Sequence, residues 1–179
     1  MLEIRSNGTL TAKGKTLTGY AAVFNSEAVL GDFVEVIRQG AFAKTLATGS
    51  NIRALYHHQG DALLGTTRGG TLQLREDGHG LAFELALPDT THGRDIAVLV
   101  ERGDLTACSF GFRVPDGGDR WEQRGAQLVR ELLEVNLHEV TLTHDPAYND
   151  TTVAMRSMPS YYAMGGRLVC NNRYWLETV

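Results

Sequence analysis

Cysteine and proline are scarce in this chain of 179 residues, which holds two cysteines and four prolines. The cysteines, Cys108 and Cys170, belong to no Cys-x-x-Cys pair and are too few for a disulfide framework. We therefore expect a chain that folds without disulfides in a reducing, cytoplasmic-type compartment. Few prolines beside 20 glycines indicate strands and turns rather than a disordered chain.

Long apolar runs and clustered positive charge are also missing. No segment approaches the ~18 consecutive apolar residues of a membrane-spanning helix. The first residues lack the basic stretch and following apolar run of a signal peptide. The net charge is −4, and both signs are scattered along the chain. We therefore expect neither a membrane protein nor a nucleic-acid-binding protein, which would show a concentrated basic face.

Short segments in which polar and apolar residues alternate, bounded by glycine, aspartate or asparagine, predict strands. Two other segments have the apolar spacing of helices, and a glycine follows each of them. A polar, glycine-rich segment, residues 115–125, indicates a loop that Trp121 anchors. About seven strands with two helices predict a single domain that is mainly β with flanking helices (α+β), built as an antiparallel barrel or sandwich. The segments are residues 16–24, 71–75, 81–87, 107–114, 126–135 and 135–144 for strands, and residues 40–48 and 91–102 for helices.

Two small nucleophilic side chains stand side by side in the predicted strand at residues 107–114. Cys108 and Ser109 point to opposite faces of such a strand, so only one of them can meet a base. Ser109 with Gly111 nearby suits a solvent-facing serine beside a bulge, or a nucleophile with room for a substrate to approach. The thiolate of Cys108 is intrinsically the better nucleophile. The residues alone leave this choice open.

A serine nucleophile needs a base and an acceptor that orients the base. His57 and His58 are adjacent and on an extended chain point to opposite sides, so one site can use only one of them. Glu139 lies in the predicted strand at residues 135–144, on the face that it shares with Leu137. On a core-facing side its carboxylate requires a partner, whereas on a solvent-facing side it is ordinary surface. Both interpretations are open.

A metal site is the other chemistry that the sequence permits, because several potential ligands are present. No pair of them has the HExxH or HxH spacing of common metal sites. We therefore expect no metal and no cofactor. The potential ligands are His57, His58, His138, His144 and Asp145.

Five segments stand in an informative order along the chain: residues 19–29, 34–46, 54–67, 80–114 and 131–157. In this order they resemble the tailed-phage prohead (capsid maturation) serine protease family, whose fold is related to herpesvirus assemblin. The resemblance covers about residues 15–157, and five ordered motifs are more specific than any one of them. It implies an assemblin-like β-barrel and a serine endopeptidase.

The resemblance also implies which residues carry the reaction. The family's Leu-Trp-Asn-His-Asp motif matches residues 55–59, which makes His58 the general base. The family's Ser-Phe-Gly-Phe motif matches residues 109–112, which makes Ser109 the nucleophile and removes Cys108 from that role.

The third member follows from the family's Glu-Val-Ser-Leu-Val-Thr motif and its following Pro-Ala, which match residues 139–147 and nominate Glu139. Assemblin-type enzymes use a second histidine in this role, so His138 is the alternative. The chain departs from the family pattern at Tyr56, where the motif has tryptophan, and at Gln59, where it has an acid. Neither departure removes a side chain of the implied triad.

The resemblance implies a phage capsid maturation enzyme that cleaves the major capsid protein or its scaffolding segment, and itself. It would act inside the prohead, in the bacterial host cytoplasm, as a homodimer. The protease domain would comprise residues 1–157, and residues 158–179 a tail that is a peripheral helix or a packaging or self-cleavage segment. The alternative is a catalytically silent assembly module of the same fold that binds scaffold or capsid protein.

Overall fold

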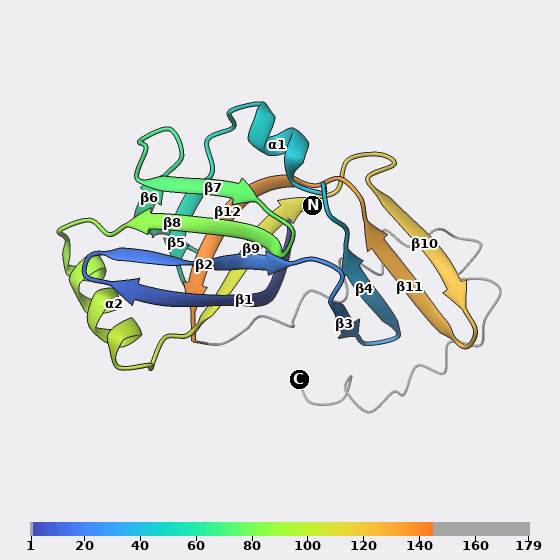
Figure 1. Cartoon of the computed structure of the whole chain (residues 1–179), viewed down its shortest axis with the longest axis horizontal. Coiled ribbons are helices and arrows are strands. Elements are labelled where there is room, and N and C mark those ends of the chain that lie inside the picture. The colour runs from blue at the N-terminus through green and yellow to red at the C-terminus, as the bar shows by residue number, and fades with distance from the viewer. Residues whose placement is uncertain (1, 145–179) are drawn as a thin grey trace, which may run out of the picture.

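The structure is a computed structural model, and it describes residues 2–144. Strands dominate this part of the chain. These residues form twelve strands and two helices, and the strands are arranged in two sheets (Figure 1). The larger sheet has the spatial order β6 (Gln59–Thr66), β5 (Arg53–Tyr56), β12 (Asn136–Thr143), β9 (Ala107–Arg113), β1 (Glu3–Lys13), β2 (Thr16–Val23), β8 (Gly80–Ala86) and β7 (Leu72–Glu76). The smaller sheet has the order β10 (Asp119–Arg124), β11 (Gln127–Leu132), β4 (Phe33–Ile37) and β3 (Glu27–Leu30).

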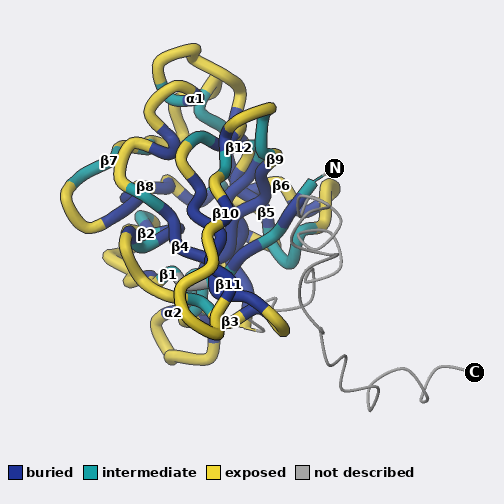
Figure 2. The backbone as a smooth tube through the Cα atoms, turned by 90° about the vertical axis from the view of Figure 1, so that its right-hand side faces the viewer, coloured by how far each residue is buried: buried dark blue, intermediate teal, exposed yellow. Residues whose placement is uncertain are grey.

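The larger sheet curls around the main hydrophobic core (Figure 1). Strand β9 shows how the sequence produces this arrangement, because its side chains alternate between the two faces of the sheet. Cys108, Phe110 and Phe112 belong to the core. Ser109 and Gly111 lie on the opposite face. Figure 2 shows buried residues gathered on the central strands and exposed residues in many of the connections between strands.

The smaller sheet is joined to the larger one by buried ion pairs. Strand β4 is buried along its whole length and pairs in parallel with β11. Glu35 of β4 accepts a 2.5 Å hydrogen bond from Arg5 of β1. Arg130 of β11 donates a 2.7 Å hydrogen bond to Glu3, also of β1. These four buried residues are called the inter-sheet charge cluster below.

Two helices lie outside the sheets. Helix α2 (Thr91–Glu101) begins at Thr90, whose hydroxyl accepts a hydrogen bond of 3.2 Å from the Gly93 N–H. It buries Ile96 and Val100 against the core and ends just before Gly103, whose φ of +78° suits only glycine well. Helix α1 (Ala43–Ala47) is short and contacts β12 and β7. No helix within residues 2–144 is long and apolar enough to cross a membrane.

The mainly β class with flanking helices is confirmed, but the details of the sheets differ from the expected antiparallel barrel of about seven strands. Two strand pairs, β4 with β11 and β5 with β12, are parallel. The edge strands of the curled sheet, β6 and β7, are not neighbours in the hydrogen-bonded order of the described residues. The segment predicted as a polar loop contains β10, although Trp121 does anchor it against Phe33, with ring centroids 5.0 Å apart. The proposed boundary at residue 157 lies outside the described residues.

Candidate active site

Ser109 is on β9, an inner strand of the larger sheet between β12 and β1. Ser109 is fully buried, and its Oγ lies on the face of the sheet away from the hydrophobic core. Cys108 points the other way, into the core. Burial raises the pKa of the Cys108 thiol far above its ordinary value, so this sulfur stays protonated and unreactive. The structure therefore favours Ser109 over Cys108 as the nucleophile.

His57 and His58 form the turn of a tight β-hairpin. Strands β5 and β6 pair so that Tyr56 faces Gln59, which leaves these two histidines as the loop. Both have positive φ, +50° for His57 and +57° for His58, as a type I′ turn requires. The expectation that they lie on an extended chain is wrong, because the strand reverses there. The turn separates the two rings: His57 Nε2 is 3.0 Å from His144 Nδ1, whereas His58 reaches β9.

Ser109, His58 and Glu139 are joined in a continuous hydrogen-bonded chain, called the candidate triad below. The Ser109 Oγ lies 2.7 Å from His58 Nε2, and His58 Nδ1 lies 2.7 Å from Glu139 Oε1. A carboxylate can only accept, so Nδ1 carries the proton. His58 Nε2 is then free to accept the proton of the serine hydroxyl. Fifty-one and 81 residues of sequence separate the partners of these two bonds.

Glu139 has a second partner that the sequence did not suggest. The Arg53 Nη2 lies 3.2 Å from Glu139 Oε2, the carboxylate oxygen that His58 does not use. Arg53 lies directly opposite Glu139 in the parallel pairing of β5 with β12. The guanidinium thus fixes the carboxylate from one side while the imidazole holds it from the other. Glu139 is almost fully buried, whereas the side chains of His58 and Arg53 are 21% and 46% exposed, so the site opens to solvent on their side.

A β-bulge at His138 sets the direction of Glu139. Leu137 faces Phe112 and Glu139 faces Gly111, so His138 is the extra residue in β12. Leu137 therefore lies in the core while Glu139 lies on the face of Ser109, and the prediction that the two share a face is wrong. A side chain at Gly111 would put its Cβ 2.8 Å from Glu139 Cγ. The glycine makes room for the carboxylate, whereas the sequence suggested room for a substrate.

His138, the alternative third member, does not occupy the position beside His58 Nδ1, which Glu139 holds. Its ring lines a separate cavity of about 340 Å³ with Arg113 and Asn51. Burial, and then the charge of Arg113, lower the pKa of His138. Its Nε2 is buried and has no hydrogen-bond partner among the described residues.

The potential metal ligands are dispersed. His57 and His144 lie together, His58 belongs to the candidate triad, and His138 lies apart. Within residues 2–144, no group of three or more histidines, cysteines and carboxylates is arranged to hold a metal ion. Asp145 lies outside the described residues.

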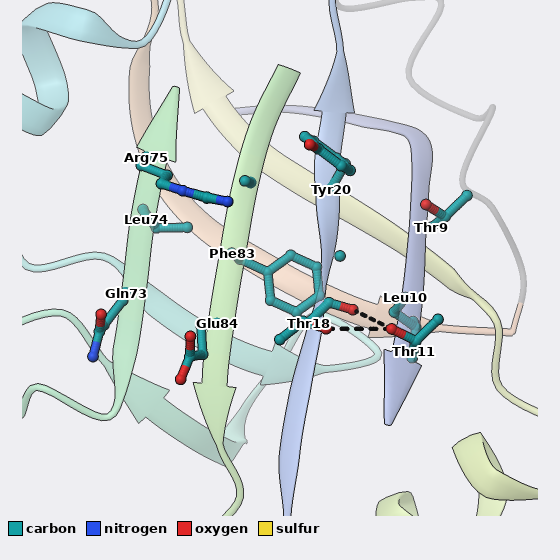
Figure 3. Close-up of a pocket in the computed structure, with 12 residues that line it drawn as sticks. Thr9, Leu10, Thr11, Thr18, Tyr20, Gln73, Leu74, Arg75, Phe83 and Glu84 are labelled. Carbon is teal, nitrogen blue, oxygen red and sulfur yellow. Dashed lines mark hydrogen bonds between the residues drawn. The ribbon is translucent and has the colours of Figure 1, made fainter. Parts of the chain in front are cut away.

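The molecule also has a cavity of about 490 Å³ over β1, β2, β7 and β8 (Figure 3). Its lining is polar at residues such as Tyr20, Arg75 and Glu84, and it includes no serine, cysteine or histidine. The cavity therefore lacks a nucleophile and base in contact, which the candidate triad has, and the chemistry is better placed at Ser109.

The comparisons with known proteins bear on the same residues. A family model described as caudovirus prohead serine protease matches residues 1–163 of the chain. The matched range includes all the described residues and so every member of the candidate triad. Comparisons with curated proteins and with solved structures found no match.

Proposed function

The chain belongs to the caudovirus prohead serine protease family, and from this premise we propose that it is a capsid maturation endopeptidase that acts through Ser109, His58 and Glu139. The observation that carries the proposal is the unbroken hydrogen-bonded chain from the serine hydroxyl through the imidazole to the carboxylate. Such a chain supplies a nucleophile, a base and an orienting group, which are the requirements for amide hydrolysis through an acyl-enzyme.

The first half of the reaction forms the acyl-enzyme. Ser109 Oγ attacks the carbonyl carbon of the scissile peptide while His58 Nε2 takes the hydroxyl proton. The carbonyl π electrons move to oxygen and give a tetrahedral oxyanion. When the oxyanion collapses, the C–N bond breaks and His58 returns the proton to the leaving amine. In the second half, a water oxygen attacks the ester carbon while His58 takes a proton from the water. The C–O bond to Ser109 then breaks, and His58 returns the proton to Ser109 Oγ.

Glu139 and Arg53 support His58 in this mechanism. The carboxylate holds the imidazole in the tautomer that leaves Nε2 free, and it stabilises the imidazolium that forms after proton transfer. Arg53 binds the other carboxylate oxygen and so limits rotation of the Glu139 side chain. The ion pair therefore preserves the direction of the Glu139–His58 hydrogen bond during turnover.

The substrate side of the proposal rests on the family. The substrates are the major capsid protein or its scaffolding segment, together with the protease itself, inside the assembling prohead. A homodimer is the proposed state. The competing function is a silent assembly module of the same fold, and an intact candidate triad favours the enzyme because a binding module has no need of it.

Labelling with a fluorophosphonate probe tests the proposal, because only an activated serine reacts. We expect the intact protein to gain one phosphonyl group on Ser109, and Ser109→Ala to gain none. Ser6→Ala is the matched control: Ser6 lies directly opposite Ser109 in the β1–β9 pair and its hydroxyl donates to the Cys108 carbonyl, so labelling should persist. A chelator should leave labelling unchanged.

The cleavage test uses co-expression with the major capsid protein of the same phage. We expect the wild-type chain to shorten the capsid protein and Ser109→Ala to leave it whole. An unlabelled wild-type protein that also leaves the capsid protein intact would exclude the enzyme and favour the silent module.

A further inference from the structure

Thr141 has a buried hydroxyl that the mechanism above leaves unused. The residue is fully buried in β12, and its Oγ1 has no hydrogen-bond partner within residues 2–144. A buried hydroxyl without a partner is destabilising, because it loses its bonds to water and gains nothing in return. Most buried threonines avoid this loss.

Thr45 shows how the same protein treats another buried threonine. Its Oγ1 donates a 2.7 Å hydrogen bond to the Val135 carbonyl and accepts one of 3.2 Å from the Leu137 N–H. The Thr45 hydroxyl therefore both donates and accepts a hydrogen bond. The Thr141 hydroxyl, in contrast, has its hydrogen-bonding capacity unused within residues 2–144, so a ligand could use it.

The position of Thr141 points to what that ligand is. Strand β12 lies between β5, whose hairpin carries His58, and β9, which carries Ser109. Thr141 lies directly opposite Ser109 in the antiparallel pair, so the two side chains share a face of the sheet. Directly opposed Cβ atoms are about 4.5–5.5 Å apart in such pairs. The Thr141 hydroxyl thus lies on the side chain next to Ser109, whose Oγ is the atom proposed to attack the substrate.

We propose that the Thr141 hydroxyl donates a hydrogen bond to the scissile carbonyl oxygen as this oxygen becomes an oxyanion, which makes Thr141 a further catalytic residue. The inference rests on the proposed function. During the attack the carbonyl carbon lies bonded to Ser109 Oγ, and its oxygen needs donors that point into the same space. Thr141 keeps its proton throughout, so it adds stabilisation of charge and no additional proton transfer. The charge develops only in the transition state, so the effect belongs to the chemical step rather than to binding.

The test compares Thr141→Val, which keeps the shape and removes the hydroxyl, with Thr141→Ser, which keeps the hydroxyl. The probe is the fluorophosphonate: Ser109 Oγ bonds to phosphorus, fluoride leaves, His58 takes the proton and negative charge gathers on the phosphoryl oxygen. We expect Thr141→Val to be labelled roughly 100-fold more slowly, the scale of one lost oxyanion donor. Thr141→Ser should react at a rate close to that of the wild type.

Thermal unfolding distinguishes a catalytic role of Thr141 from a structural one, because loss of a structural hydrogen bond would lower Tm. Thr141→Val should leave Tm unchanged or raise it, because it removes an unpaired buried hydroxyl. The matched control Thr45→Val should lower Tm, since it breaks two hydrogen bonds.

Two results would overturn the role of Thr141 while the proposed function stands. One is Thr141→Val labelling at the wild-type rate; the other is a Thr141→Val protein that unfolds at a lower temperature or fails to fold. Failure of the wild-type protein to react at all would count against the proposed function itself, so the two failures are distinguishable.

Discussion

The candidate triad and the inter-sheet charge cluster are both networks of buried or half-buried polar side chains, yet they are built differently. In the cluster, Arg130 and Arg5 both make hydrogen bonds to Glu3 and Glu35, and Arg130 makes another to Asp119 of β10. In the triad, one hydrogen bond joins each consecutive pair, and the central imidazole is partly exposed. The cluster contains only carboxylates and guanidinium groups, whereas the triad contains an imidazole, which can accept a proton at one ring nitrogen while it donates from the other.

The difference indicates what each network contributes. Buried charges that are fully paired hold two sheets in a fixed relation, and losing one partner leaves the others uncompensated. A linear chain with a movable proton contributes little rigidity but can exchange charge with a substrate. The hydroxyl of Thr141, which has no partner in the described part of the chain, fits the same division, because an unsatisfied polar group is tolerated where a substrate is expected to supply the partner.

The largest expected effect is a loss of catalytic activity on changing the triad, with little loss of stability. Glu139→Gln keeps the shape but offers His58 an amide, which can donate to Nδ1 and so favour the wrong tautomer. We expect turnover to fall by about 10²–10⁴-fold, with a much smaller change in stability, measured by capsid-protein cleavage and by urea unfolding.

His138→Gln is the control for that prediction, since His138 belongs to a different cavity and should tolerate the change. Near-normal turnover of Glu139→Gln together with an inactive His138→Gln would transfer the third role to His138.

The next effect concerns stability. Arg130→Met leaves Arg5 to compensate the buried carboxylates of Glu3 and Glu35, and it removes the arginine that binds Asp119. We expect the free energy of unfolding to fall by about 3–5 kcal/mol, measured by urea denaturation. Arg94→Met, which removes an exposed pair with Asp89, should change it by less than about 1 kcal/mol. Equal losses in the two variants would show that burial of the cluster is energetically unimportant.

Alternation of polar and apolar residues predicted strands well where one face of a strand is buried and the other is not, as in β7. It failed for β4, which is buried along its whole length, and for β10, a polar strand at the edge of the smaller sheet. Such strands have no period of two to detect, and only their neighbours reveal them. The parallel pairings follow from how distant segments meet, which propensity does not encode.

The site was predictable as a set of side chains but not as a geometry. Ser109, His58 and Glu139 follow from the motif order, and the structure places them in contact. The positions of Arg53 opposite Glu139 and of Thr141 opposite Ser109 could not be predicted, because they depend on the registers of β12 with β5 and β9. The bulge at His138 decides which way Glu139 points, and no residue pattern in the strand marks it.

A smaller effect tests whether acid sensitivity arises away from the triad. Glu131 is bound by Arg38, Arg120 and Arg124, and its hydrogen bonds, that from Arg38 first, lower its pKa from 4.5 to about 2. Because the folded pKa is the lower one, this stabilisation is complete above about pH 4.5 and is lost as pH falls toward 2. It amounts to at most about 3 kcal/mol, since the exposed arginines are screened.

Glu131→Gln should therefore unfold more easily at neutral pH and show a flatter dependence of Tm on pH between about 5 and 2 than the wild type. Glu84→Gln, at an exposed position on β8, should keep the wild-type slope. The same slope in all three proteins would place the acid-sensitive groups elsewhere.

The smallest expected effect concerns the backbone turn that holds His58 in the triad. The charge cluster, in contrast, is held by its ion pairs. His57 has a φ of +50°, a conformation that asparagine tolerates well and β-branched residues do not. We expect His57→Asn to keep wild-type activity and to change the free energy of unfolding by less than about 1 kcal/mol, whereas His57→Val should lower it by about 1–2 kcal/mol. Urea unfolding and fluorophosphonate labelling measure the two quantities. A His57→Asn protein that folds normally but loses labelling would show that the His57 ring itself, and not the turn, positions His58.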